Sequence, residues 1–196
     1  MNRKKRMFKT GLGIVISLLT MACRPGYMVP TTAEVTTSPE RATVVFYRPS
    51  RWGGANTSAV YDVTAEDTVF FGGVKGGGKV VAQVAPGNHI FMVSGENADF
   101  SYATLEAGKL YYMRIQTRMG FGKMRYSLNP IHSDMIGEAR VKVNACERFE
   151  KNGKSDSWFQ KHRASIEEKR QRYFKKWMTK PEANRPRLRA SDNVQL

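Results

Sequence analysis

The sequence is poor in the residues that build disulfide frameworks, metal centres and membrane spans. Of its 196 residues, two are cysteine and three are histidine. Two cysteines exclude a disulfide scaffold and a four-cysteine zinc site, and His89, His132 and His162 share no ligand spacing. No apolar run reaches the ~18 residues that a mature spanning helix needs. We therefore expect a globular chain with no cofactor and no metal.

Acidic residues are also scarce. The chain has 17 Asp and Glu against 32 Lys and Arg, for a formal net charge of +15. Residues 23–146 hold 13 Lys and Arg against 10 Asp and Glu, whereas residues 147–196 hold 14 against 7. Such an excess is typical of proteins that meet polyanions, and the compartment decides which polyanion is available.

The N-terminus indicates export. Residues 1–22 combine a basic stretch with the apolar run 11–22, and Cys23 follows. This pattern predicts a signal peptide and resembles a bacterial lipoprotein signal, in which Cys23 becomes an N-terminus that carries fatty chains such as palmitate. Arg24, in place of Asp, is similar to the outer-membrane sorting pattern. Cleavage near Ala22 without lipid, giving a secreted or free periplasmic protein, is the alternative.

An exported protein does not meet the nucleic acid of its own cell. We therefore expect a membrane partner through the N-terminal lipid, with anionic lipid headgroups or a cell-wall polymer as further partners, and no nucleic acid. No protein partner is indicated. Cys146 is interpreted as a buried apolar side chain; a bridge to an unlipidated Cys23 is the alternative.

The middle of the chain has the pattern of short strands separated by turns. Residues 23–40 form a Pro- and Thr-rich segment that we interpret as the anchor cysteine and a tether. Residues 41–146 predict a mainly β, antiparallel sandwich-like domain, because turns recur every 8–12 residues. The expected strands are 42–48, 58–63, 68–72, 79–84, 89–94, 100–106, 109–117, 123–128 and 138–146.

The C-terminal part predicts a helix followed by a tail. Residues 147–180 contain a helical pattern over 156–179, which Pro181 ends. The helix either docks on the sandwich or lies on an anionic membrane surface with its cations outward. Residues 181–196 are expected to be a disordered basic tail.

Several short motifs resemble a family of small bacterial lipoproteins known as domain of unknown function 2846. They are ATVVFYRP at 42–49, YDV at 61–63, PGNH at 86–89 and AGKLYY at 107–112. The resemblance covers about residues 40–130. It implies a compact β-sandwich and a lipid anchor, and it implies no reaction and no binding residues.

Two motifs are similar to catalytic sites only in composition. Residues 73–79 match G-x-x-x-x-G-K, but Val80 stands where a phosphate loop has Ser or Thr, and a strand pattern follows where a helix is required. We interpret the motif as a hairpin turn. His132, Ser133 and Asp134 are sequence neighbours, whereas catalytic triads converge from separate segments. The chain is therefore predicted not to be an enzyme.

Two regions are candidates for ligand or surface binding. The first is the loop with Arg48, Arg51 and Trp52, whose guanidinium groups and indole suit an anionic or sugar ligand; a structural Trp is the alternative. The second is the helix, through its cations and its last tryptophan. Its candidate residues are Arg170, Lys175, Lys176 and Trp177. Further positive charge is expected on one hairpin, from Arg114, Arg118, Lys123 and Arg125.

Overall fold

A computed structural model describes residues 26–53, 56–120 and 124–195. The strands are β1 (Met28–Pro30), β2 (Ala42–Arg48), β3 (Ser58–Asp62), β4 (Val69–Val74), β5 (Gly78–Val84), β6 (Gly87–Ser94), β7 (Ala98–Leu105), β8 (Leu110–Met119), β9 (Met124–Pro130), β10 (Glu147–Lys151) and β11 (Arg187–Leu188). The helices are α1 (Ile136–Asn144) and α2 (Ser155–Met178), with short 3-10 turns at Ser133–Met135, Glu182–Asn184 and Ala190–Asp192.

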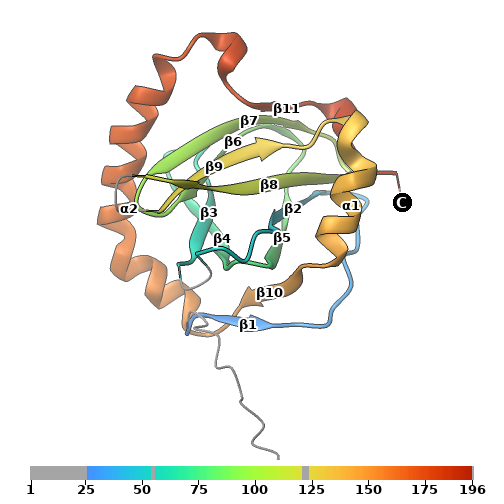
Figure 1. Cartoon of the computed structure of the whole chain (residues 1–196), viewed down its shortest axis with the longest axis horizontal. Helices are drawn as coiled ribbons and strands as arrows, with labels where there is room; N and C mark the ends of the chain where they lie inside the picture. The colour runs from blue at the N-terminus through green and yellow to red at the C-terminus, as the bar shows by residue number, and fades with distance from the viewer. Residues whose placement is uncertain (1–25, 54–55, 121–123, 196) are drawn as a thin grey trace, which may run out of the picture.

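The strands form two sheets, with the two helices on opposite sides of them (Figure 1). One sheet has the order β1-β10-β5-β2-β8-β9 and the other β11-β7-β6-β3-β4. Most neighbouring strands are antiparallel, but β2 and β8, β10 and β5, and β11 and β7 run parallel. The expected mainly β, sandwich-like fold with a C-terminal helix is confirmed. The expectation of antiparallel sheets is wrong in part, because each sheet contains at least one parallel pair.

Strand β2 shows why the chain folds in layers. Its side chains are buried on both faces. Val44 and Phe46 lie in the main core, where the Phe46 ring meets the Phe91 ring edge-on at 5.3 Å. Val45 and Tyr47 belong to a second cluster under α1. Alternate side chains of a strand point to opposite faces, so a strand that is apolar on both needs cover on each side.

Helix α2 covers the outer face of the five-stranded sheet. Phe159 stacks on Phe70 of β4 at 5.7 Å, and Trp177 packs against Phe100 of β7 at 5.9 Å. The helix begins and ends within one residue of its predicted bounds. Docking on the sandwich, rather than lying on a membrane, is therefore the alternative that the structure adopts.

The predicted strand over residues 138–146 is wrong, because α1 occupies most of it. A strand would place Ala139, Val141 and Val143 on one face. In the structure Ala139 and Val143 are buried four residues apart, while Val141 is 71% exposed. Spacing of four is the helical period, and three small apolar residues at alternate positions could not distinguish the two patterns.

The predicted tether is wrong from residue 26 onward. Tyr27 and Met28 are buried, and β1 pairs with β10. The Tyr27 ring stacks on Trp158 of α2 at 4.1 Å. Strand β10 also pairs with β5, so the domain extends past the expected boundary at residue 146. Cys146 is free and buried in the cluster under α1.

The predicted disordered tail is ordered over residues 181–195. Strand β11 adds to the edge of β7, and the Val194 amide donates to the Leu110 carbonyl oxygen at 2.7 Å. Leu188 and Val194 are buried, and Asp192 accepts from His132 Nδ1 at 2.9 Å. Two apolar anchors and backbone pairing with an unprotected strand edge order a segment whose composition is mostly polar.

A histidine–aspartate pair fixes the start of β6. His89 Nδ1 lies 2.7 Å from Asp62 Oδ2, and Nε2 lies 2.9 Å from the Ala85 carbonyl oxygen. Both partners accept, so both ring nitrogens donate and the ring is charged. The hydrogen bond to Asp62 raises the pKa of His89, against the effect of burial. Burial raises the pKa of Asp62, but hydrogen bonds from His89 and Thr64 outweigh it and lower that pKa overall.

We expect this pair to stabilise the fold most between about pH 4 and about pH 6.5, the ordinary pKa values of Asp and His. The contribution of His89 is complete below its ordinary pKa and is lost as the pH rises through its raised folded-state pKa. That of Asp62 is lost as the pH falls through its lowered pKa. H89Q should lower the free energy of unfolding by about 1.5 kcal/mol near the middle of this range and by less at alkaline pH. Urea denaturation at both pH values checks this, and equal losses would contradict a charged pair.

Candidate functional site

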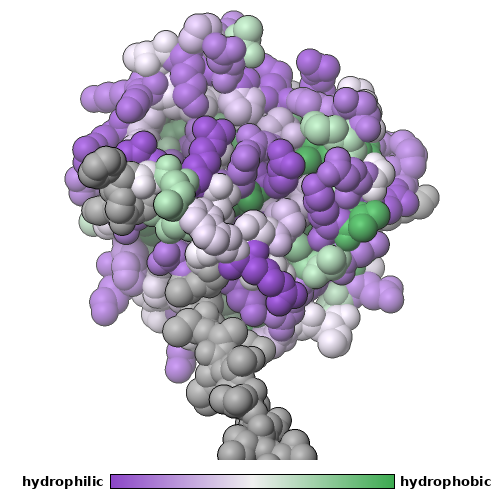
Figure 2. All heavy atoms as spheres, in the orientation of Figure 1, coloured by the Kyte–Doolittle hydropathy of each residue, from purple (hydrophilic) through white to green (hydrophobic). Residues whose placement is uncertain are grey.

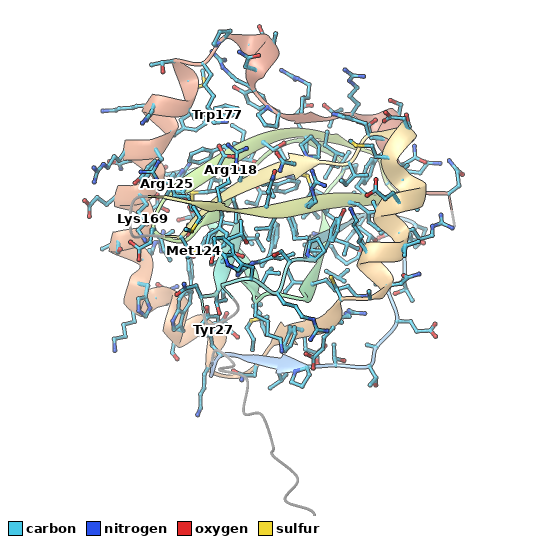
Figure 3. All side chains as sticks on the ribbon, in the orientation of Figure 1. Tyr27, Arg118, Met124, Arg125, Lys169 and Trp177 are labelled. Carbon is cyan, nitrogen blue, oxygen red and sulfur yellow. The ribbon has the colours of Figure 1, made fainter. Side chains whose placement is uncertain are left out.

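A cleft of about 820 Å³ lies between the C-terminal half of α2 and the edge of the six-stranded sheet. Strands β8 and β9 supply Arg118 and Arg125, and α2 supplies Arg172 and Lys176. Lys180, just after the helix, completes the set. Figure 3 shows Arg118 and Arg125 on the side of the molecule where α2 lies, between the levels of Trp177 and Lys169. All five cationic residues are exposed.

The strand register brings two of these cations together. Arg118 and Arg125 are direct partners in the antiparallel β8–β9 ladder. Directly opposed side chains have Cβ atoms about 4.5–5.5 Å apart, and like charges at such positions are destabilising. Among the described residues, neither guanidinium forms an ion pair with a carboxylate. The hairpin therefore places two positive charges at directly opposed positions in the wall of the cleft.

Asp99 is the only acidic residue of the described lining. Its Oδ2 accepts from the Leu128 amide at 3.2 Å, and its Oδ1 lies 3.5 Å from Lys180 Nζ. Arg172 lies over the Tyr173 ring, 5.7 Å from its centroid. One carboxylate against five cations leaves the cleft with a large excess of positive charge.

A second cavity of about 400 Å³ adjoins the cleft at Tyr126 and continues along α2 toward its start. Aromatic side chains form part of its wall, among them Tyr27, Tyr61 and Trp158. Burial raises the pKa of Tyr27 to about 12 and also raises that of Tyr61, so both hydroxyls are neutral. Lys169 Nζ donates to the Gly95 carbonyl oxygen at 2.6 Å on the same wall. The wall of this cavity thus combines aromatic and ionisable side chains, without the excess of cations that the cleft has.

The predicted binding site of Arg48, Arg51 and Trp52 does not form. Arg48 is fully buried and turns inward, where it donates to the carbonyl oxygens of Trp52, Gly53 and Asn56. Arg51 and Trp52 remain exposed. The Arg48 guanidinium is thus used to close the loop that the pattern presented as a binding loop, and it is not available to a ligand.

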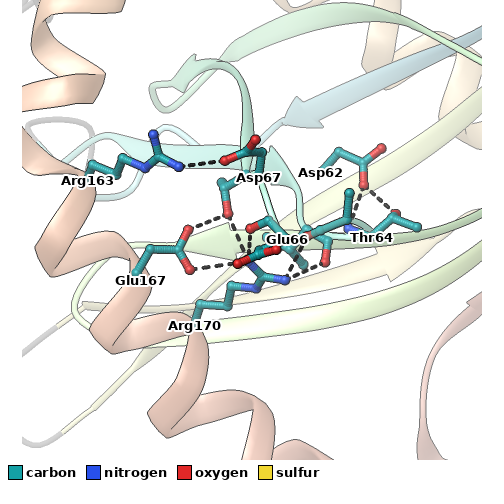
Figure 4. A network of polar contacts seen from close by, with 10 residues as sticks. Asp62, Thr64, Glu66, Asp67, Arg163, Glu167 and Arg170 are labelled. Atoms are coloured by element: carbon teal, nitrogen blue, oxygen red, sulfur yellow. Dashed lines mark hydrogen bonds and ion pairs between the residues drawn. The ribbon is translucent and has the colours of Figure 1, made fainter.

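Arg170 is also committed within the fold (Figure 4). Its guanidinium donates to the carbonyl oxygens of Val63, Ala65 and Glu66 and pairs with Glu167 at 3.2 Å. It therefore fastens α2 to the loop between β3 and β4. The prediction that it binds a surface is wrong because a neighbouring loop, distant in sequence, supplies its acceptors.

The remaining predicted residues are divided between core and surface. Trp177 is 2% exposed and packs on the sheet, so it is not free to enter a bilayer. Lys176 lines the cleft, and Lys175 is exposed outside its lining. Cys23 lies outside the described residues. In the sequence, Arg118 and Arg125 are recognisable only as added charge; their common place with Lys176 depends on the docking of α2.

The two catalytic look-alikes have structural roles. Residues 73–79 span the end of β4, a turn at 75–77 and the start of β5; Gly77 has a φ of 73° and a strand follows rather than a helix, as predicted. The predicted hairpin is wrong, because β4 and β5 lie in different sheets and the turn joins the two. His132 Nδ1 and the Ser133 amide both bind the carboxylate of Asp192, which holds the C-terminal segment. In the described ranges, no group of three His, Cys, Asp or Glu side chains is placed to hold a metal ion.

Comparison of the chain with protein-family models and with curated proteins finds no match. Within the part of the chain that the structure describes, no helix is both long enough and apolar enough to span a membrane. The pattern of residues 1–23, the fold and the cationic cleft are therefore the basis for proposing a function.

Proposed function

We propose that the protein is a non-enzymatic binding module, a lipoprotein anchored through Cys23 on the periplasmic side of an outer membrane. The observation that carries this proposal is the order of basic segment, apolar run and cysteine in residues 1–23. Arg24 after the cysteine favours outer-membrane sorting. One acylated cysteine with more than one chain gives stable anchoring.

Each of the three histidines makes a structural contact within the fold. His89 is held between Asp62 and the Ala85 carbonyl oxygen, and His132 binds Asp192. His162 Nδ1 lies 2.7 Å from the Trp158 carbonyl oxygen of the same helix. Both ring nitrogens of His89 are thus engaged in holding the fold, whereas His132 and His162 are held through Nδ1.

The anchor would hold the domain close to the membrane. Four peptide steps separate Cys23 from the buried Tyr27, a span of at most ~14 Å. Tyr27 lies against Trp158 in the first turn of α2, and Trp177 follows 19 residues later. At 1.5 Å per residue this is ~28 Å along the helix. Figures 1 and 3 show these two ends of α2 apart, so the cleft lies at the end away from the anchor.

Cys23→Ser is expected to move the protein from the membrane fraction to the soluble envelope fraction. The sulfur is the atom that carries the diacylglyceryl group, and Ser cannot replace it. Cell fractionation with immunodetection measures the distribution, and Cys146→Ser is the matched control, because Cys146 is buried and free. Unchanged membrane association of C23S would overturn the anchor.

A secreted or free periplasmic protein that binds an anionic polymer through its basic C-terminal segment is the second candidate. The cations of α2 and Lys180 in the cleft favour it. This candidate predicts that the wild-type protein is found in the soluble fraction. Its mature chain would either carry an unmodified Cys23 or begin at a residue after Cys23.

A further inference from the structure

The cleft beside α2 concentrates charge that the fold does not need. The opposed pair Arg118 and Arg125 opposes folding through repulsion, and Lys176 adds a third cation from another element. An unfavourable local interaction that no other contact offsets is usually found at a functional site. The missing compensation here is negative charge, which a ligand can supply.

The size and the side chains of the cleft limit the class of ligand that it can bind. A volume of about 820 Å³ is that of a site for a small molecule or a few sugar rings rather than for a folded domain. Guanidinium groups bind carboxylate and phosphate with two parallel hydrogen bonds. The ring of Tyr173, partly exposed on the wall, offers an apolar surface beside these charges. The face shown in Figure 2 is mainly hydrophilic, with apolar side chains only in scattered places.

We infer that the cleft binds an anionic polysaccharide, one that bears carboxylate or phosphate groups along its chain. This inference rests on the proposed function, because the envelope supplies such polymers. The described lining carries five cations and one carboxylate, and a polymer with anionic groups at regular spacing can meet several of these cations at once.

The test measures binding in solution to the chain of residues 23–196 carrying Cys23→Ser. The probes are labelled oligogalacturonate for carboxylate and phosphorylated oligomannose for phosphate, with a neutral maltooligosaccharide for comparison. We expect one or both anionic probes to bind, with an affinity that falls steeply between about 50 and about 300 mM salt. The neutral probe should not bind.

The decisive variant is the double replacement Arg118→Gln with Arg125→Gln. It should weaken binding by about tenfold or more, while its melting temperature is unchanged or higher because the repulsion is removed. The matched control is Lys154→Gln with Lys161→Gln, which removes the same charge from exposed positions near the start of α2. Its affinity should stay within about twofold.

Equal losses in both double variants would overturn the site, because the attraction would then be that of net charge. Binding to neither anionic probe would overturn the ligand class. Tighter binding to polyglutamate, or to vesicles containing phosphatidylglycerol, would replace the polysaccharide by an acidic protein segment or a lipid surface. All measurements use an unlipidated chain, so their failure is distinct from failure of the anchor.

Discussion

Arg48→Met should lower the free energy of unfolding by about 3 kcal/mol. The Arg48 guanidinium is completely buried and donates to Thr117 Oγ1 as well as to three carbonyl oxygens of the loop after β2. It also lies over the Tyr126 ring, 4.9 Å from the centroid. Methionine fills much of the volume but leaves these partly buried acceptors without the donors that Arg48 supplies, and each such loss is destabilising.

Urea denaturation of the purified chain measures this effect, and Arg51→Met is the control. Arg51 is the neighbouring exposed arginine, and its replacement should change stability by no more than about 0.5 kcal/mol. Arg48→Lys should behave like Arg48→Met, because an ammonium cannot reproduce the planar fork of donors. A stable R48M would show that the loop is held by other contacts.

Trp177→Ala should lower the free energy of unfolding by about 4 kcal/mol. The indole packs against Phe100 and Tyr102 of β7 at 5.9 and 4.9 Å, and Arg185 lies over it at 5.8 Å. Its removal leaves a cavity between α2 and the sheet. Hydrogen exchange should then show loss of protection in the last turns of α2 and in β11.

Trp52→Ala provides the matched comparison for Trp177→Ala. Trp52 is 50% exposed, so its removal should change stability by no more than about 0.5 kcal/mol. If Trp177 entered a lipid surface instead, W177A would weaken binding to anionic vesicles and leave the unfolding transition unchanged. That pattern would contradict the docking of α2.

The strands were predictable because their signals are local. Residues 42–48 are β-branched and aromatic and end at Pro49, and β2 occupies the same residues. The motif at 73–79 was correctly predicted to form a turn rather than a phosphate loop, because a strand pattern follows it. The predicted hairpin is wrong, because β4 and β5 belong to different sheets, which no local pattern shows. Helix α2 was predictable from its length, since about 24 residues of consistent pattern define a face even when its apolar stripe is interrupted.

The segments outside these strands were not predictable, because distant partners order them. Tyr27 is buried by Trp158, and Leu188 by the edge of β7. Neither partner is visible in a local window. Composition alone assigned residues 26–40 and 181–195 to a tether and a tail. In the structure, a few apolar side chains of each segment pack against distant elements, and these tertiary contacts order the segment despite its composition.

The candidate site was predictable only in part. The sequence placed positive charge on the β8–β9 hairpin and on α2, but not their meeting in one cleft. Arg48 and Arg170 were selected for their charge, and the fold uses both as internal donors. An arginine that binds a ligand and one that closes a loop have the same local pattern, so burial must be known to distinguish them.

Mass measurement of the N-terminal peptide of the protein isolated from cells tests the central claim most directly. The account predicts that the chain begins at Cys23 and that this peptide carries the added mass of a diacylglyceryl group, with a further acyl chain on its amine. A chain that begins at Met1, or a peptide with an unmodified Cys23 thiol, would contradict it.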